Sequence, residues 1–138
     1  MKVLVVDDAE ISLVFITRLL TKFEHEVVTC RSGEAAIELM EKGELPQVMF
    51  LDWMLPGASG IDVCKRIRAA AGGNRVFIIF MTARGCDKDR LEAIAAGADI
   101  YLPKPIKVDQ LRSTLVNAEQ SLFAAKSPEE TKKTNVIR

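Results

Sequence analysis

The stretch VMFLDWMLPGASG, residues 48–60, runs from an apolar segment through a turn toward the start of a helix. Its apolar residues are continuous rather than alternating, which is typical of a strand covered on both faces. Leu55–Gly57 predicts a turn, and Ser59 with Asp62 three residues later predicts a helix N-cap. The stretch therefore predicts a buried strand, a turn and a crossover helix, with Asp52 at the end of the strand.

The same unit recurs along the chain. Further apolar runs occupy Val3–Val6, Val27–Val28, Val76–Met81 and Ile100–Leu102. Apolar residues at helical spacing lie between and after them: Ile11, Val14, Phe15, Leu19 and Leu20; Ala36, Ile37 and Met40; Ile61, Cys64 and Ile67; Leu91, Ile94 and Ala95; Leu111, Leu115 and Leu122. Five alternations of strand and helix predict an α/β fold with a parallel sheet and right-handed crossovers.

Composition narrows the class of protein. The chain has 138 residues, 49% of them hydrophobic, with 19 basic residues balancing 19 acidic ones. One globular domain is therefore expected, without the basic field that nucleic acid or an anionic membrane would need. Val76–Met81 is too short to span a membrane, and the N-terminus lacks the pattern of a signal peptide. The three dispersed cysteines fit no disulfide framework, so a cytoplasmic protein with free thiols is predicted.

Polar side chains follow four of the predicted strands. Asp7 and Asp8 end the first, Asp52 the third and Thr82 the fourth, and the fifth leads to Lys104. Ligands of open parallel sheets bind outside these carboxyl ends. Crowded carboxylates need a cation, and ligands that are all oxygen suit Mg²⁺. Taken singly, each has an ordinary alternative: a turn aspartate, a hydroxyl bonded to backbone, a solvated lysine.

The chemistry of these groups suggests phosphoryl transfer. A carboxylate at position 52, at the sheet edge, can attack phosphorus and form an acyl phosphate. Mg²⁺ would offset the charge of the transferring group. The Thr82 hydroxyl can donate to a phosphoryl oxygen, and Lys104 can supply a fixed positive charge. We also expect the Lys104-Pro105 bond to be cis, since such bonds are confined almost entirely to X-Pro.

Five motifs occur in sequence order: Asp7-Asp8, Asp52-x-x-Leu55-Pro56-x-x-Ser59-Gly60, Thr82-Ala83, Gly97-Ala98-Asp99-x-Tyr101-Leu102 and Lys104-Pro105. Together they resemble the receiver domain of two-component response regulators over residues 1–122. The resemblance implies a flavodoxin-like doubly wound (βα)5 sandwich with a parallel sheet in the order 2-1-3-4-5. Residues 123–138 are then expected to be a polar tail or linker.

The resemblance also implies the site. Asp52 would be the phosphoacceptor, and Mg²⁺ would be bound by Asp8, Asp52 and the backbone carbonyl of Met54, with Asp7 acting partly through water.

The remaining roles follow from the same resemblance. Thr82 and Tyr101 would form the switch pair, and Lys104 would contact the phosphoryl group. The protein would accept this group from a histidine kinase or phosphotransfer protein, catalysing only its own phosphorylation and dephosphorylation. Its output would be a homodimer or effector contact through the fourth helix, fifth strand and fifth helix, a face expected to carry Arg90, Glu92, Lys107 and Arg112. The chain is either a stand-alone receiver or the N-terminal receiver of a longer regulator whose effector domain is missing here.

Three other functions fit the sequence less well. A Mg²⁺-dependent phosphohydrolase commonly has a general acid two residues after its nucleophile, where this chain has Met54. A flavin-binding electron carrier needs a hydroxyl- and glycine-rich loop after the first strand, whereas Asp7–Glu10 would repel phosphate. A receiver-like interaction module that has lost phosphorylation would not need to keep the full set of site residues. The sequence therefore favours a phosphorylation-controlled switch.

Overall fold

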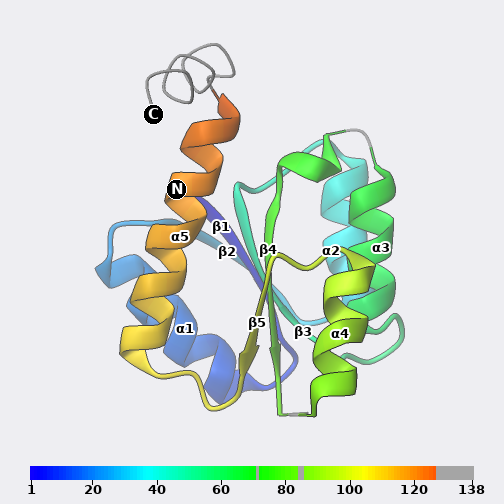
Figure 1. Cartoon of the computed structure of the whole chain (residues 1–138), viewed down its shortest axis with the longest axis horizontal. Coiled ribbons are helices and arrows are strands. Elements are labelled where there is room, and N and C mark those ends of the chain that lie inside the picture. Colours follow the sequence, from blue (N-terminus) through cyan, green and yellow to red (C-terminus); the bar gives the residue numbers. More distant parts are fainter. Residues whose placement is uncertain (71, 84–85, 127–138) are drawn as a thin grey trace.

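A central parallel sheet organises the molecule (Figure 1). The computed structural model describes residues 1–70, 72–83 and 86–126. Its strands pair in the order β2-β1-β3-β4-β5, which confirms the predicted order. The strands are β1 (Lys2–Val6), β2 (Glu26–Cys30), β3 (Val48–Asp52), β4 (Phe77–Thr82) and β5 (Ile100–Pro103).

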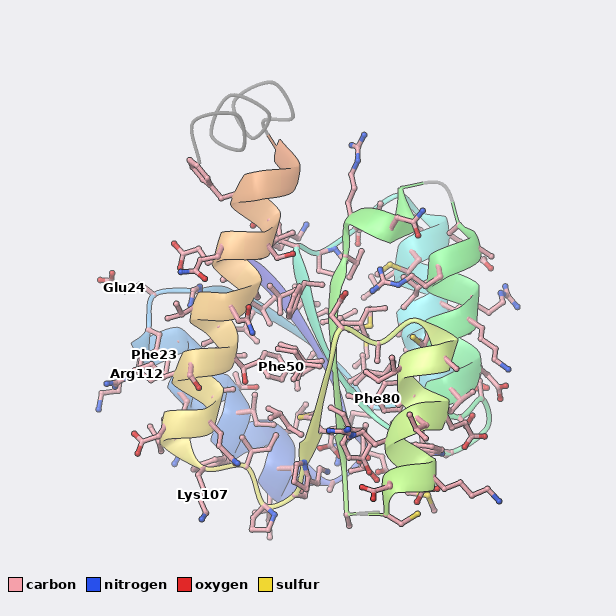
Figure 2. The ribbon with its side chains drawn as sticks, in the orientation of Figure 1. Phe23, Glu24, Phe50, Phe80, Lys107 and Arg112 are labelled. Atoms are coloured by element: carbon pink, nitrogen blue, oxygen red, sulfur yellow. The ribbon has the colours of Figure 1, made fainter. Side chains whose placement is uncertain are left out.

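Helices cover both faces of the sheet, as the predicted doubly wound fold requires. The helices α1 (Glu10–Lys22) and α5 (Val108–Lys126) lie on one face; α2 (Gly33–Glu41), α3 (Gly60–Ala69) and α4 (Asp87–Ala96) lie on the other (Figure 1). A short 3-10 helix, Gly73–Arg75, precedes β4. Each face has its own core: Phe50 belongs to the core under α1 and α5, and Phe80 to the core under α2, α3 and α4 (Figure 2). Every residue of β3 and β4 is buried, because these strands are covered on both faces.

Local signals in the sequence fix several boundaries. The Ser59 side chain accepts a hydrogen bond from the Asp62 amide at 3.3 Å, and the Asp62 carboxylate accepts one from the Ser59 amide at 3.2 Å, forming the predicted capping box. Gly97 ends α4 with a φ of 116°, a left-handed conformation that glycine adopts at little cost. The Lys104-Pro105 peptide bond is cis, as predicted.

Two predicted helix faces are wrong. On α4 the predicted stripe is largely exposed, with Leu91 65% and Ile94 46% accessible, while Asp89, Ala93 and Ala96 are buried. The contact between α4 and the rest of the domain therefore includes the small side chains of Ala93 and Ala96. Helical spacing identifies residues that share a face, but it does not say which face meets the sheet.

The same correction applies to the first turns of α1. Of the predicted stripe, Leu20 is buried and Leu19 is partly buried, but Ile11, Val14 and Phe15 are exposed, Ile11 to 87%. Ile16, which does not belong to the predicted stripe, is the other buried residue of this helix.

The last helix, α5, extends beyond residue 122, where the receiver domain was predicted to end. It continues through Lys126, because no proline or glycine interrupts the sequence before Pro128. The rest of the predicted tail, residues 127–138, lies outside the described residues. None of the described helices is both long enough and apolar enough to cross a membrane.

Candidate functional site

The predicted side chains meet at the carboxyl edge of the sheet. Asp7 follows β1 and Asp52 ends β3, and both are buried, whereas Asp8 is exposed. Carboxylate oxygens of these three residues lie within 4.8 Å of one another. Thr82 ends β4 and is fully buried. The topology therefore gathers the predicted acidic cluster from separate strands.

Lys104 connects the two buried carboxylates. Its Nζ donates to Asp7 Oδ2 at 2.8 Å and to Asp52 Oδ2 at 3.0 Å. Its backbone amide donates to the Thr82 carbonyl at 2.7 Å, which fixes the start of this side chain beside the end of β4. The sequence placed Lys104 at this edge, but it gave no indication that a single ammonium group bridges both aspartates.

Backbone amides hold the other oxygen of each buried aspartate. Asp7 Oδ1 accepts from the Ala9 amide at 2.9 Å, and Asp52 Oδ1 accepts from the Met54 amide at 3.2 Å. Asp8 has no hydrogen bond or ion pair to any other described residue. Its exposed carboxylate is thus the member of the cluster with both oxygens open to a ligand.

Gly60 allows the close approach of α3 to the end of β3. A Cβ atom at this position would lie 2.8 Å from Trp53 Cα and closer still to the Asp52 carbonyl oxygen. Because both of these atoms belong to the backbone, they cannot move aside as a flexible side chain would. The glycine after Ser59 therefore has a steric role in placing Asp52.

Burial changes the proton affinity of the site. It raises the pKa of Asp52 to about 6; the hydrogen bond and charge of Lys104 oppose this rise, and the neighbouring Asp7 adds to it. Burial acts to lower the pKa of Lys104, but its two aspartate partners outweigh burial, and the net shift is upward. At neutral pH an ionised Asp52 therefore lies against a protonated Lys104.

The donor set fits a hard divalent cation. Three carboxylates contribute a charge of −3 and Lys104 contributes +1, which leaves −2 at one edge of the sheet. All of the acidic ligand atoms are oxygens. Mg²⁺ prefers such ligands, binds through one or two carboxylates and keeps part of its water shell.

Tyr101 lies outside the acidic cluster. It is half-buried on β5, where it is in register with Phe80 of β4 and packs against the core that also contains Ala93 and Ala96 of α4. Thr82, two residues beyond Phe80 on the same strand, lies nearer the cluster. The predicted switch residues thus occupy two neighbouring strands, one at the site and one toward α4.

The aromatic residue after Asp52 is a packing residue. Trp53 is buried, and its ring meets Phe80 edge to face, with 5.5 Å between the ring centroids. This places an indole next to the candidate metal ligands.

Sequence reasoning missed one feature near the site. Ile11, Val14 and Phe15, assigned above to the core stripe of α1, form an exposed apolar patch in its first turns, just after Asp8. No single-sequence signal separates this patch from a core stripe, because both have helical spacing.

Fold and site together define a class: a doubly wound α/β domain with a cluster of three aspartates and a lysine at the carboxyl edge of its sheet. The family model of the response regulator receiver domain matches residues 3–116. The chain belongs to this family and is a receiver domain of the two-component response regulator type.

Relatives support the assignment. The phosphate regulon transcriptional regulatory protein PhoB of Rhizobium meliloti is 42% identical over 111 residues, covering 80% of this chain and 48% of PhoB. The transcriptional regulatory protein TcrA of Mycobacterium tuberculosis is 37% identical over 116 residues, covering 83% of this chain and 44% of TcrA. The chain thus spans about half the length of these relatives.

Solved structures of receiver domains have the same fold as this chain. The receiver domain of a LuxO repressor protein from Vibrio parahaemolyticus has a TM-score of 0.82 at 26% identity, covering 92% of this chain and 95% of that one. The receiver domain of the sensor histidine kinase PA1611 from Pseudomonas aeruginosa has a TM-score of 0.75 at 30% identity, covering 82% and 92%. That second structure holds a magnesium ion in its active site cleft.

Proposed function

We propose that this chain is a phosphorylation-controlled switch in which Asp52 accepts a phosphoryl group from a histidine kinase or phosphotransfer protein. One observation carries the proposal: the Asp52 carboxylate lies at the sheet edge, beside Asp7 and hydrogen-bonded to Lys104. Its pKa of about 6 leaves it mainly ionised, and so nucleophilic, at neutral pH.

The transfer step is an in-line displacement at phosphorus. An Asp52 carboxylate oxygen forms the new O–P bond, the P–N bond of the phosphohistidine breaks, and the imidazole leaves with the electron pair. Lys104 already lies within hydrogen-bonding distance of Asp52, so its ammonium group can pass to an oxygen of the bound phosphoryl group. Hydrolysis of the acyl phosphate in the same site would reset the switch.

We assign the metal ligands to Asp8, Asp52 and the Met54 carbonyl, with Asp7 acting partly through water. When bound, Mg²⁺ supplies charge that offsets the developing charge on the transferring oxygens. The −2 charge of the site and the open carboxylate of Asp8 support this assignment.

Mg²⁺ affinity tests the metal assignment. We expect Asp8→Asn to weaken Mg²⁺ binding by about 10-fold or more, because it removes a charged ligand that has no hydrogen bond or ion pair with the described part of the chain. Trp53 lies next to the ligands, so its fluorescence reports the titration, and calorimetry gives an independent affinity. The matched control is Asp109→Asn, which removes an exposed carboxylate on α5. Equal affinities for the wild type and Asp8→Asn would remove Asp8 from the ligand set.

The α1 patch suits the phosphodonor protein. A partner that delivers a phosphoryl group to Asp52 must contact the surface around Asp8, and Ile11, Val14 and Phe15 supply apolar area there. The partner therefore has an apolar surface around its phosphohistidine.

The output face is the surface of α4, β5 and the adjoining side of α5. On α4 it includes the exposed Leu91 and Ile94, flanked by the charged Arg90 and Glu92. We propose that Thr82 moves toward the phosphoryl oxygens, that Tyr101 turns inward beside it, and that this face then binds an effector or a second copy. Arg112 is not part of this face, because it lies over Phe23, 5.0 Å from the ring centroid, on the α1 side of α5 (Figure 2).

Beryllofluoride, a phosphoryl mimic, tests the proposed function. We expect amide chemical shifts to change around Asp52 and also at Tyr101 and along α4. In Thr82→Val, which keeps the shape of the side chain and removes its hydroxyl, the changes near Asp52 should remain and those at Tyr101 should largely disappear. Changes confined to the neighbourhood of Asp52 in the wild type would show that site and face are not coupled.

A further inference from the structure

The loop between β3 and α3 is held from outside by α2. This loop, residues 54–58, begins at Met54, whose backbone carbonyl is one of the proposed metal ligands. At the other end of the loop, the Ala58 amide donates a hydrogen bond to Glu34 Oε2 at 2.8 Å. Glu34 is the second residue of α2. A carboxylate on a helix that supplies no proposed ligand therefore binds the backbone of a loop that does.

Two glycines allow α2 and the loop to lie this close together. A Cβ atom at Gly57 would lie 2.7 Å from one oxygen of the Glu34 carboxylate and closer still to the other. Gly57 also has a φ of 73°, a left-handed conformation that glycine adopts at little cost. A Cβ atom at Gly33 would lie 2.6 Å from the Ala58 carbonyl oxygen. Side chains at these two positions would push α2 and the loop apart, so the sequence leaves the space that the Glu34 contact requires.

The hydrogen bond of Glu34 acts on position more than on stability. Glu34 is exposed, so water competes for both partners and the bond adds little to the free energy of unfolding. Its carboxylate nevertheless fixes the Ala58 end of the loop. At the other end, the Met54 amide donates to Asp52 Oδ1 at 3.2 Å. The loop is thus tied at both ends, once to the proposed phosphoacceptor and once to α2.

The identity of the metal ion makes this position important. Mg²⁺ requires nearly octahedral coordination by oxygens at about 2.0–2.1 Å, whereas Ca²⁺ accepts irregular coordination at about 2.3–2.6 Å. A ligand that is free to shift therefore weakens Mg²⁺ binding more than Ca²⁺ binding. A loss of negative charge near the site, by contrast, weakens the binding of both divalent ions alike.

We propose that Glu34 is a positioning residue for the metal site and that it favours Mg²⁺ over Ca²⁺ by holding the loop 54–58. It acts through the Ala58 amide on the loop that carries the Met54 carbonyl, and not by contact with the metal or the phosphoryl group. The inference rests on the proposed function, because it takes the Met54 carbonyl as a metal ligand.

Two substitutions separate the hydrogen bond from the charge. Glu34→Gln removes the negative charge but keeps an oxygen that can accept from the Ala58 amide, whereas Glu34→Ala removes both. We expect Glu34→Ala to weaken Mg²⁺ binding by about 5-fold or more and Ca²⁺ binding by less than about 2-fold. Glu34→Gln should stay within about 2-fold of the wild type for both ions, because salt screens an exposed charge. Trp53 fluorescence and calorimetry measure the affinities.

Glu38→Ala is the matched control. Glu38 lies one turn later on α2, its side chain is exposed, and it pairs with Lys42 at 3.8 Å. This variant removes the same type of carboxylate from the same helix and should leave both metal affinities unchanged.

Hydrogen exchange tests the same contact in the metal-free protein. The Ala58 amide should exchange with solvent about 10-fold faster in Glu34→Ala than in the wild type, because its acceptor is lost. In Glu34→Gln most of the protection should remain. Exchange of this amide at the wild-type rate in Glu34→Ala would show that Glu34 does not hold the loop.

Three affinity results would also overturn the proposal. Glu34→Ala could bind both ions as the wild type does, it could lose Mg²⁺ and Ca²⁺ affinity equally, or Glu34→Gln could be as weak as Glu34→Ala, which would assign the loss to charge. In each of these cases Asp8→Asn still weakens Mg²⁺ binding, and the proposed function is unaffected. A wild type that binds no Mg²⁺ would instead refute the metal assignment and this inference together.

Discussion

Asp52→Asn is expected to abolish phosphorylation, lowering the rate with acetyl phosphate and Mg²⁺ by at least about 100-fold. The amide has nearly the shape of the carboxylate but lacks the anionic oxygen that attacks phosphorus. Intact-mass spectrometry at mildly acidic pH, where an acyl phosphate survives, measures the product. Asp109→Asn, which changes an exposed carboxylate on α5, should behave like the wild type. Phosphorylation of Asp52→Asn at the wild-type level would mean that another residue is the nucleophile.

The same variant should be more stable than the wild type at pH 7. Burial raises the pKa of Asp52 to about 6, above its ordinary value of 3.8, so the folded state holds this proton more tightly than the unfolded chain does. The contribution of Asp52 to the free energy of unfolding therefore decreases as the pH rises from about 4 to about 6. Asparagine does not titrate, so its advantage should be present above pH 6 and disappear below pH 4. Urea unfolding across this range, without Mg²⁺, measures the difference.

The alternation of strands and helices could be predicted from the sequence because buried parallel strands are continuous apolar runs. The run Val76–Met81 lies almost wholly within β4, and Val48–Leu51 lies within β3. The order of the strands came from the resemblance to a family, since apolar runs alone do not specify their neighbours. Helix faces were less predictable, because α4 uses Ala93 and Ala96 for packing and exposes Leu91.

The site could be predicted in outline for a geometric reason. The carboxyl ends of parallel strands share one edge, so polar residues at those ends must gather, and Asp7, Asp52 and Thr82 do so. The ion pairs of Lys104 with Asp7 and Asp52 could not be predicted, because they depend on the path of the chain after β5. That path carries Lys104 far enough inward for its Nζ to reach both aspartates.

This bridging geometry leads to a prediction with two opposite effects. Lys104→Met keeps the length of the side chain and removes its charge, leaving Asp7 and Asp52 buried without their cation. Removing one member of a buried ionic cluster typically costs about 3–5 kcal/mol of unfolding free energy. We expect a loss of about 3 kcal/mol without Mg²⁺ at pH 7, measured by urea unfolding. Lys107→Met, which changes an exposed lysine three residues later, should lose little.

Mg²⁺ affinity should change in the opposite direction. Lys104 and a metal ion compete for the same carboxylates, so removing the lysine changes the charge of the site from −2 to −3 and eliminates a repulsion between cations. We expect Lys104→Met to bind Mg²⁺ on the order of 10-fold more tightly and to recover part of its lost stability when Mg²⁺ is added. Phosphorylation should nevertheless be slower than in the wild type, because Mg²⁺ cannot replace an ammonium group directed at a phosphoryl oxygen. Weaker Mg²⁺ binding in Lys104→Met would show that this lysine organises the metal site rather than competing with the metal.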